Sequence, residues 1–211
     1  MIVKNFFNIL LAYGILLPQI LFFEIFYLLR GYKRNSFNIL NNDRYTDNIP
    51  CPYFFLHKLK KFFQNTKIEN FMDLGCGDGR SIYFFNKQKK INFYGIEYNN
   101  LIYNSCKESF KKYDNVQIIN DDIMSFNFLK FDCDCYFIGD PLKQKIDFEN
   151  LIKRIIEENI NVKKRIYFIL ANVDSNKRDI FYNYKLIDSF QKNNKGYYIY
   201  SNEKINEGSK N

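Results

Sequence analysis

The sequence predicts an α/β fold with a mostly parallel sheet, a C-terminal antiparallel hairpin and an N-terminal hydrophobic helix. From residue 70 onward, short apolar segments alternate with amphipathic ones, as in chains whose parallel strands are joined by helices. The segment at 165–170 reads RIYFIL, and its apolar run is typical of a central strand covered on both faces. Of the 211 residues, 46% are hydrophobic and 26% are charged, which supports a full core and excludes a disordered or collagen-like chain.

The N-terminal segment is predicted to be a membrane anchor. Residues 6–29 read FFNILLAYGILLPQILFFEIFYLL, and a helix of that length can cross a hydrocarbon core of about 30 Å. Arg30, Lys33 and Arg34 follow the segment, and this charge predicts a single-pass protein whose remainder faces the cytoplasm. The alternative is a helix that lies on a surface, with Glu24 among the interruptions that define one face. A cleaved signal peptide is disfavoured because no small-residue cleavage site follows.

Composition divides the rest of the chain. Asn and Asp are frequent in residues 35–49 and no apolar period is visible there, so this stretch is predicted to be a polar linker. The predicted parts are the hydrophobic helix at 1–34, the linker at 35–49, a folded domain at 50–201 and a disordered tail at 202–211.

Charge and cysteine content restrict the partners. The net charge of +8 favours anionic partners such as phospholipid headgroups or nucleic acid, although the lysines are scattered and form no long block. The five cysteines include no Cys-x-x-Cys pair and the chain has one histidine, so no metal site is predicted. Reduced thiols in a domain that faces the cytosol fit this count best.

The elements of the domain follow from their patterns. Amphipathic periodicity predicts helices at 53–65, 80–90, 101–112 and 146–159. Short apolar runs predict strands at 71–74, 92–97, 116–119, 135–138, 165–170, 186–190 and 197–200. The last two strands flank Asn193-Asn194-Lys195-Gly196, which is a turn signal. Ligands of such sheets bind beyond the carboxyl ends of the parallel strands, so the residues just after the strands are the candidate site.

The strongest candidate follows the first strand. Asp73-Leu74-Gly75-Cys76-Gly77-Asp78-Gly79-Arg80 places three glycines where the backbone must turn sharply and come close to a ligand. The amides of the next helix then point at that ligand. Arg80 stands where a dinucleotide fingerprint requires its third glycine, and it is predicted to form a salt bridge at the start of the helix.

Carboxylates follow the next three strands as well. Glu97 ends the second strand, where a carboxylate can accept both hydroxyls of a ribose. Asp122 follows the third, where a carboxylate can accept from an adenine amine between apolar walls such as Ile96, Tyr98 and Ile123. Asp140 follows the fourth. Each acid could be a solvated loop residue, but four at successive strand ends point to one site.

With these residues in place, FMDLGCGDGR at 71–80 resembles the first motif of the class I S-adenosylmethionine-dependent methyltransferases, over roughly residues 50–200. The resemblance implies a Rossmann-like, seven-stranded sheet and S-adenosyl-L-methionine as cofactor. It also implies residue roles. The methionine part would be held by Asp73 and by the backbone of Gly75, Cys76, Gly77 and Gly79, the ribose by Glu97, and the adenine by Asp122 and Ile123.

The layout also resembles small membrane-anchored methyltransferases, some of which methylate lysines of membrane proteins. An amine acceptor must arrive neutral, so a lysine with a free pKa near 10.4 has to lose a proton. Asp140 is predicted to orient the amine or to accept that proton, and Tyr53 to close over the cofactor. Relatives that modify nucleic acids or glutamine often carry Asx-Pro-Pro-aromatic, whereas this chain has Asp140-Pro141-Leu142-Lys143, which puts that substrate class in doubt.

Three functions therefore stay open. The first is a membrane-tethered methyltransferase acting on a protein side chain, with lysine favoured. The second is a methyltransferase acting on a small molecule, a lipid or a nucleic acid, although no dense basic face for RNA is evident. The third is a non-catalytic, Rossmann-like interaction module. The methyl acceptor, the number of methyl groups transferred and the oligomeric state are not specified by the sequence.

Overall fold

The computed structural model describes residues 13–32, 42–87, 91–159, 164–192 and 195–205. Its strands are β1 (Asn70–Leu74), β2 (Asn92–Glu97), β3 (Val116–Asn120), β4 (Cys135–Ile138), β5 (Tyr167–Ala171), β6 (Tyr184–Lys192) and β7 (Lys195–Lys204). Its α-helices are α2 (Leu17–Leu29), α3 (Tyr53–Asn65), α4 (Arg80–Asn86), α5 (Asn100–Phe110), α6 (Lys145–Glu158) and α7 (Ser175–Arg178). Short 3₁₀ helices are η1 (Gly14–Leu16), η2 (Phe128–Phe131) and η3 (Asp179–Phe181).

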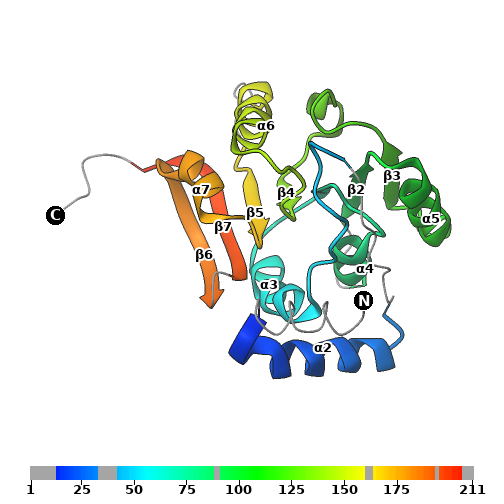
Figure 1. The fold of residues 1–211 in the computed structure, drawn as a ribbon. Coiled ribbons are helices and arrows are strands. Elements are labelled where there is room, and N and C mark those ends of the chain that lie inside the picture. The colour runs from blue at the N-terminus through cyan, green and yellow to red at the C-terminus, as the bar shows by residue number, and fades with distance from the viewer. Residues whose placement is uncertain (1–12, 33–41, 88–90, 160–163, 193–194, 206–211) are drawn as a thin grey trace.

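The seven strands form one sheet in the order β3-β2-β1-β4-β5-β7-β6 (Figure 1). The pairs β1·β2, β2·β3, β1·β4 and β4·β5 are parallel, whereas β7 runs antiparallel to both β5 and β6. The strand order turns back at β1, so the carboxyl ends of β1, β2 and β4 meet where a ligand of an open α/β sheet binds. The predicted fold class, with its parallel sheet and final hairpin, is confirmed.

Two apolar cores cover the two faces of the sheet. Side chains of the strands alternate between them: Phe71, Phe93 and Phe137 pack with α2, α3, α4 and α5. Met72, Tyr136 and Phe168 face the other side and pack with α6 and η3. Every residue of β4 and β5 is buried, which explains why these segments read as continuous apolar runs.

Most predicted elements match the observed ones within two residues. The helix at 53–65 and the strands at 92–97 and 135–138 have the predicted limits. The structure differs at the C-terminus, where β7 continues to Lys204 and so includes residues that the sequence assigned to a disordered tail. The helices η2, α7 and η3 were not predicted, since each spans at most four residues and shows no periodicity.

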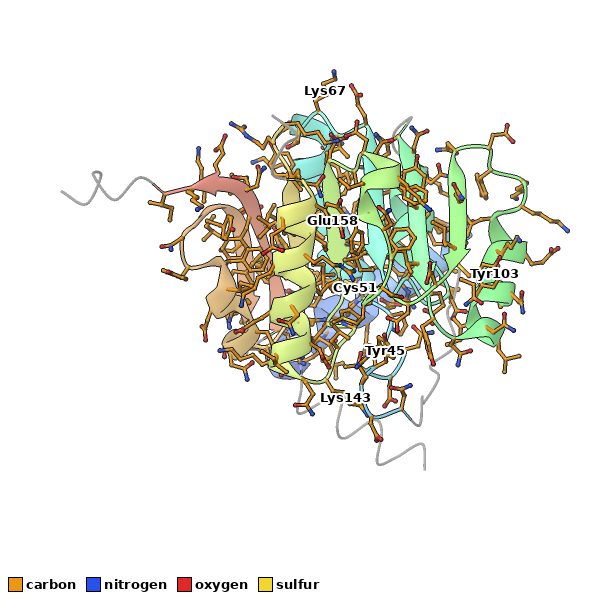
Figure 2. All side chains as sticks on the ribbon, turned by 90° about the horizontal axis from the view of Figure 1, so that it is seen from above. Tyr45, Cys51, Lys67, Tyr103, Lys143 and Glu158 are labelled. Atoms are coloured by element: carbon orange, nitrogen blue, oxygen red, sulfur yellow. The ribbon has the colours of Figure 1, made fainter. Side chains whose placement is uncertain are left out.

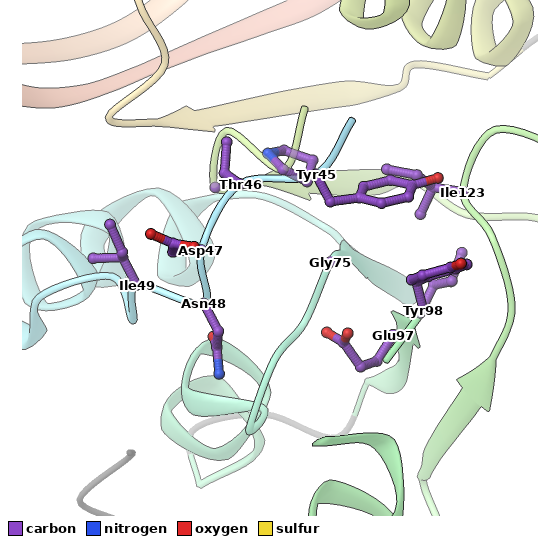
Figure 3. Close-up of a pocket in the computed structure, with 12 residues that line it drawn as sticks. Tyr45, Thr46, Asp47, Asn48, Ile49, Gly75, Glu97, Tyr98 and Ile123 are labelled. Atoms are coloured by element: carbon purple, nitrogen blue, oxygen red, sulfur yellow. The ribbon is translucent and has the colours of Figure 1, made fainter. Parts of the chain in front are cut away.

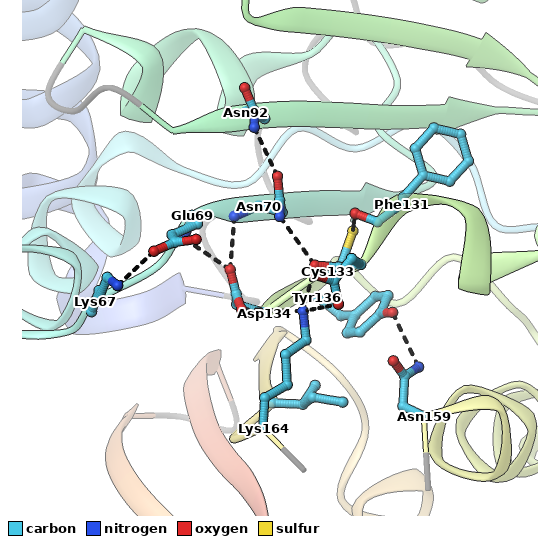
Figure 4. Close-up of polar contacts among 12 residues, drawn as sticks. Lys67, Glu69, Asn70, Asn92, Phe131, Cys133, Asp134, Tyr136, Asn159 and Lys164 are labelled. Carbon is cyan, nitrogen blue, oxygen red and sulfur yellow. Dashed lines mark hydrogen bonds and ion pairs between the residues drawn. The ribbon is translucent and has the colours of Figure 1, made fainter. Parts of the chain in front are cut away.

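The amino ends of the central strands are tied together by polar contacts (Figure 4). The Asp134 carboxylate accepts hydrogen bonds from the backbone N–H groups of Glu69 and Asn70, both at 2.8 Å, and Lys164 lies 3.3 Å from its other oxygen. Lys67 marks this end in Figure 2, opposite Tyr45 and Lys143 at the other end. This network therefore fixes the strands at the end away from the candidate site.

The N-terminal apolar segment differs from the predicted membrane anchor. Residues 1–12 lie outside the described part of the chain. Pro18 stands in the first turn of α2, which follows the turn η1 and has 13 residues, or about 20 Å of helix. Among the described residues, none of the helices combines the length and apolar character that crossing a bilayer requires. The transmembrane helix and single-pass location predicted from the sequence are therefore not supported.

Helix α2 packs against α3 and α4 instead, on one side of the molecule (Figure 1). Both oxygens of Glu24 lie 2.9 Å from one guanidinium nitrogen of Arg80, the first residue of α4. One of them also accepts a hydrogen bond from the backbone N–H of Tyr53, at 2.9 Å. Arg80 thus forms the predicted salt bridge, with a partner in the N-terminal segment. The carboxylate that would be costly inside a bilayer faces the protein interior.

Replacing Glu24 with Gln is expected to destabilise the fold. The Arg80 side chain is 9% exposed, so removing its partner leaves a nearly buried, uncompensated charge. Removing one member of a buried pair costs about 3–5 kcal/mol, and because Glu24 is partly exposed we expect about 2 kcal/mol. Denaturant unfolding measures the change, and Glu69→Gln, whose partner Lys67 is exposed, is the control. An unchanged midpoint for Glu24→Gln would show that α2 is not held by this ion pair.

Candidate functional site

The glycine turn after β1 is the centre of the site. Gly75 and Gly77 have φ angles of +78° and +53°, in the left-handed region that favours glycine. Close neighbours exclude side chains there too, since a Cβ on Gly75 would lie 2.9 Å from Cβ of Pro141 and a Cβ on Gly77 would lie 2.2 Å from Oδ1 of Asn48. Both glycines are therefore required for the chain segments to meet here.

Gly79 and Cys76 complete the turn and pack against neighbouring parts of the chain. Gly79 is the N-cap residue of α4, and a Cβ there would contact Phe110 and Cys106. The backbone N–H of Cys76 donates to the carbonyl of Ile96 at 2.9 Å, while its thiol is buried. The neighbouring thiol of Cys106 and burial raise the pKa of Cys76, which disfavours the reactive thiolate form. Its predicted contribution through the backbone stays a prediction.

Glu97 joins the second strand to the glycine turn (Figure 3). Its carboxylate accepts from the backbone N–H of Gly77 at 2.9 Å and from that of Asn99 at 2.8 Å. Burial raises the pKa of Glu97, and these two N–H donors act in the opposite direction. A carboxylate has about four acceptor positions, so Glu97 can still accept from a ligand hydroxyl group.

Asp73 lies one layer deeper. Its carboxylate is 4% exposed and accepts a hydrogen bond from the Ser81 hydroxyl. Burial raises the pKa of Asp73 to about 7, with Ser81 opposing and Glu97 adding to the rise. The carboxyl ends of the strands enclose a hollow whose lining includes Gly75, Ile96, Glu97 and Ile123. Asp73 is not among the lining residues. The contact with the methionine part that the resemblance implies for Asp73 stays a prediction.

Asp122 and Ile123 follow β3 at the same end of the sheet. Ile123 lines the hollow together with Ile96 and Tyr98, as predicted for apolar walls. Asp122 accepts hydrogen bonds from the backbone N–H of Met124 at 2.7 Å and from the hydroxyl of Tyr45. The ring of Tyr45 stacks on that of Tyr98 with centroids 5.0 Å apart. An aromatic ring of the protein thus lies beside the predicted adenine carboxylate.

Residues 42–49, named here the strap, cross the carboxyl ends of the strands. The strap is fixed by an antiparallel bridge between Tyr45 and Leu142 and by a hydrogen bond of 3.0 Å from the Thr46 N–H to the carbonyl of Pro141. Its members Tyr45, Thr46, Asp47, Asn48 and Ile49 line the hollow (Figure 3). The sequence placed these residues in a linker, and only the aromatic ring of Tyr45 within a polar stretch could have indicated their role.

Asn48 carries an unsatisfied polar atom at this site. Its side chain lies over Gly77, and its amide nitrogen Nδ2 is buried without a hydrogen-bond partner among the described residues. Leaving a buried donor unpaired costs about 1–3 kcal/mol, so such a group is a candidate ligand donor. The site therefore offers a glycine turn, a carboxylate, an apolar slot and an amide donor that no described residue pairs.

The two predicted catalytic residues have different surroundings. Asp140, at φ +57°, carries a carboxylate that lies 2.7 Å from the ammonium of Lys177. Burial raises the pKa of Asp140, and Lys177, itself 3% exposed, opposes that rise. Its neighbours Gly139 and Pro141 line the hollow. Lys177 was missed because nothing in the sequence separates it from the other basic residues.

Tyr53 lies on the α2 side of the protein. Its ring is 1% exposed, and the guanidinium of Arg80 lies 4.5 Å from the ring centroid. The residues that line the hollow include the strap but not Tyr53. The role over a cofactor predicted for Tyr53 stays a prediction, whereas Tyr45 is among the residues that line the hollow.

Comparisons with known proteins agree with this geometry. The sequence model of the family described as "Methionine biosynthesis protein MetW" matches residues 62–180, which is more than half of the chain. An RNA methyltransferase from Salinibacter ruber in complex with S-adenosyl-L-homocysteine is similar in structure, with a TM-score of 0.59 and 14% identity over 75% of this chain and 97% of that chain. No curated protein matches the sequence.

Two further solved structures have the same fold. The putative methyltransferase yhhF from Escherichia coli gives a TM-score of 0.59 and 15% identity over 72% of this chain and 87% of that chain. The N-methyltransferase NodS from Bradyrhizobium japonicum, in complex with S-adenosyl-L-homocysteine, gives a TM-score of 0.53 and 10% identity over 69% of this chain and 83% of that chain. The fold is therefore that of S-adenosylmethionine-dependent methyltransferases, as the sequence motif predicts.

The buried carboxyl of Asp73 is expected to make stability depend on pH. Its folded-state pKa of about 7 exceeds the ordinary value of 3.8, so the folded state binds the proton more tightly than the unfolded state. The free energy of unfolding should fall as pH rises from about 4 to about 7, at up to about 1.4 kcal/mol per pH unit. Asp73→Asn should flatten this slope in denaturant unfolding between pH 5 and pH 8. Equal slopes in the two proteins would contradict an elevated pKa.

Proposed function

The chain belongs to the MetW family and to the class I S-adenosylmethionine-dependent methyltransferases, and we propose that it transfers the cofactor's methyl group to an amine, with a protein lysine as the favoured acceptor. The observation that carries the proposal is the glycine turn held by Glu97, beside a buried amide donor on Asn48 that none of the described residues pairs. This arrangement suits a ligand that has an amino-acid end, a ribose and a base.

The residues present fit the cofactor part by part. The Asn48 amide and the backbone of the glycine turn would hold the carboxylate of the methionine end. For Asp73 to attract the ammonium group, its buried carboxyl would have to be ionised, which its raised pKa opposes. Glu97 keeps acceptor positions for the ribose hydroxyls. Ile96, Tyr98 and Ile123 would enclose the adenine. When bound, the cofactor supplies a methyl group already activated on a sulfonium.

The strap would exclude water from this site. It lies over the hollow and is tied to the segment after β4 through the Thr46 hydroxyl, which donates to the carbonyl of Asp140 at 2.8 Å. A poorly hydrated site favours a reaction in which charge is lost from sulfur. The Tyr45 hydroxyl donates to Oδ1 of Asp122, so an adenine amine would bind the other oxygen of this carboxylate or compete with that hydroxyl.

Asp140 supports the choice of an amine acceptor. Its carboxylate already binds an ammonium group in this structure, that of Lys177, at the end of β4. A carboxylate in this position can orient an incoming amine and accept the proton that the amine must lose. A small-molecule acceptor is the second candidate, since the family is named for methionine biosynthesis.

Cofactor binding is tested first. In Glu97→Gln the side chain loses its charge and one acceptor, so the Kd for S-adenosyl-L-homocysteine, measured by calorimetry, should rise at least about tenfold. Glu69→Gln, at an exposed ion pair outside the hollow, is the matched control and should bind like the wild type. A folded Glu97→Gln protein with unchanged affinity would contradict the assignment of the pocket.

The acceptor is tested by product analysis. Radiolabelled methyl groups should be recovered as N-methyl-lysine in a protein fraction, and the rate should rise with pH as the amine loses its proton. Asp140→Asn should lower kcat without changing the Kd for S-adenosyl-L-homocysteine. The double variant Asp140→Asn/Lys177→Met removes both charges, and so separates loss of the carboxylate from exposure of an unpaired buried ammonium. Label recovered on oxygen or sulfur would contradict an amine acceptor, and label recovered on nucleic acid would contradict a protein lysine.

A further inference from the structure

The outward face of α2 carries a continuous apolar surface. Its exposed side chains, named here the outer stripe, are Leu21, Phe22, Ile25, Leu28 and Leu29. We propose that the outer stripe inserts into the interfacial region of an anionic phospholipid bilayer, with α2 lying parallel to the membrane. This proposal does not depend on the methyltransferase activity and differs from a helix that spans the bilayer.

The spacing of the outer stripe is that of one helix face. Positions 21, 22, 25, 28 and 29 follow the i, i+1, i+4, i+7, i+8 pattern of residues that share a side of an α-helix. Phe22, Ile25 and Leu29 are 61%, 57% and 83% exposed. Leu17, Ile20 and Tyr27 on the inner face are buried. The helix is therefore apolar on both sides, and only one of them is covered by the described residues.

Contacts of the inner face hold the stripe outward. The ion pair of Glu24 with Arg80 is on this side, and the ring of Phe23 lies 5.6 Å from that of Phe54. Rotating α2 to bury the stripe would move Glu24 away from Arg80 and expose apolar core. Figure 1 shows α2 at the edge of the molecule with α3 and α4 on its inner side. The exposed stripe is thus fixed by the fold.

The chemistry of the face favours lipid over a protein partner. Within residues 20–29, all of them described, each exposed side chain is apolar, so the stripe offers no side-chain hydrogen bonds. Protein interfaces carry about one hydrogen bond per 100–200 Å². A helix that lies in a bilayer interface needs no hydrogen bonds from its inserted side chains, and burying apolar side chains among the lipids is favourable. Elsewhere, exposed side chains such as Leu101, Leu129 and Tyr182 lie on different elements, as is normal for a protein surface.

The basic residues in and next to the N-terminal segment favour an anionic bilayer over a neutral one. Residues 1–34 contain four basic residues and one acid, and that acid is Glu24, which faces inward. Arg30 is exposed at the end of α2, with its guanidinium 4.1 Å from the ring centroid of Phe26. Lys87 lies 4.2 Å from the ring centroid of Tyr32 nearby. Basic side chains beside an apolar helix face are the arrangement that binds acidic headgroups.

A tryptophan reporter tests insertion directly. The chain contains no tryptophan, so Phe22→Trp introduces a single fluorophore in the outer stripe. Vesicles of phosphatidylcholine with phosphatidylserine should shift its emission to shorter wavelength, and brominated lipid should quench it. Tyr182→Trp, at a position 78% exposed on the C-terminal side of α7, is the control and should not respond. Equal responses, or none from Phe22→Trp, would overturn the proposal.

A matched pair of triple variants tests the energetics. Phe22→Ser/Ile25→Ser/Leu29→Ser should lower the vesicle partition coefficient at least tenfold. The control Leu101→Ser/Leu129→Ser/Ile146→Ser removes apolar side chains of similar exposure, at 80%, 55% and 59%, and should bind vesicles like the wild type. Higher salt should weaken binding to phosphatidylserine vesicles. Both triple variants should bind S-adenosyl-L-homocysteine with the affinity of the wild type. A failure of the membrane proposal can therefore be distinguished from a failure of the proposed cofactor site.

Other occupants of the face give different results. A wild-type dimer in sedimentation that only the outer-stripe variant dissociates would assign the face to a second copy of the chain. Phe22→Trp emission that is blue-shifted without vesicles, and shifts back when residues 1–12 are deleted, would assign it to the protein's own N-terminus. Either result overturns the membrane proposal.

Discussion

The left-handed backbone between β1 and α4 is the constraint on which the rest of the site depends. Because Gly77 turns its N–H toward Glu97, the end of β2 is fixed relative to the end of β1 by a hydrogen bond of 2.9 Å. Because Gly75 and Gly77 have no side chains, Pro141 and Asn48 can approach from the segments after β4 and before α3. Four parts of the chain thus meet at one turn, and a methyl group on either glycine would separate them.

Features that depend on local sequence were predictable, whereas features that depend on distant contacts were not. The strand and helix pattern and the glycine turn depend on consecutive residues, so most of the limits were predicted within two residues. The role of Tyr45 depends on Asp122, which is 77 positions away, and that of Lys177 depends on Asp140, which is 37 positions away. A polar stretch and one lysine among many carry no local signal of such pairing, so the strap and the buried ion pair appear only in the folded chain.

The N-terminal segment shows a different limit of sequence reasoning. Hydropathy counts apolar residues without distinguishing those that face a protein core from those that face outward. Helix α2 contains both, and Pro18 and the turn before it interrupt the run that a long helix would need. Glu24 looked like an interruption of an apolar segment, but it is the group that joins this segment to the domain. The physical reason is that pairing with the buried Arg80 offsets the free-energy cost of placing a carboxylate in an apolar segment.

This ion pair also relates the outer surface of α2 to the glycine turn. Arg80 follows Gly79 directly and begins α4, so the residue that α2 holds is the first one beyond the turn. Glu24 in addition accepts from the N–H of Tyr53 at the start of α3, and thereby joins three helices on one face of the sheet. The position of α2 and the start of the helix that follows the glycine turn are therefore fixed by the same carboxylate, because both α3 and α4 donate to it.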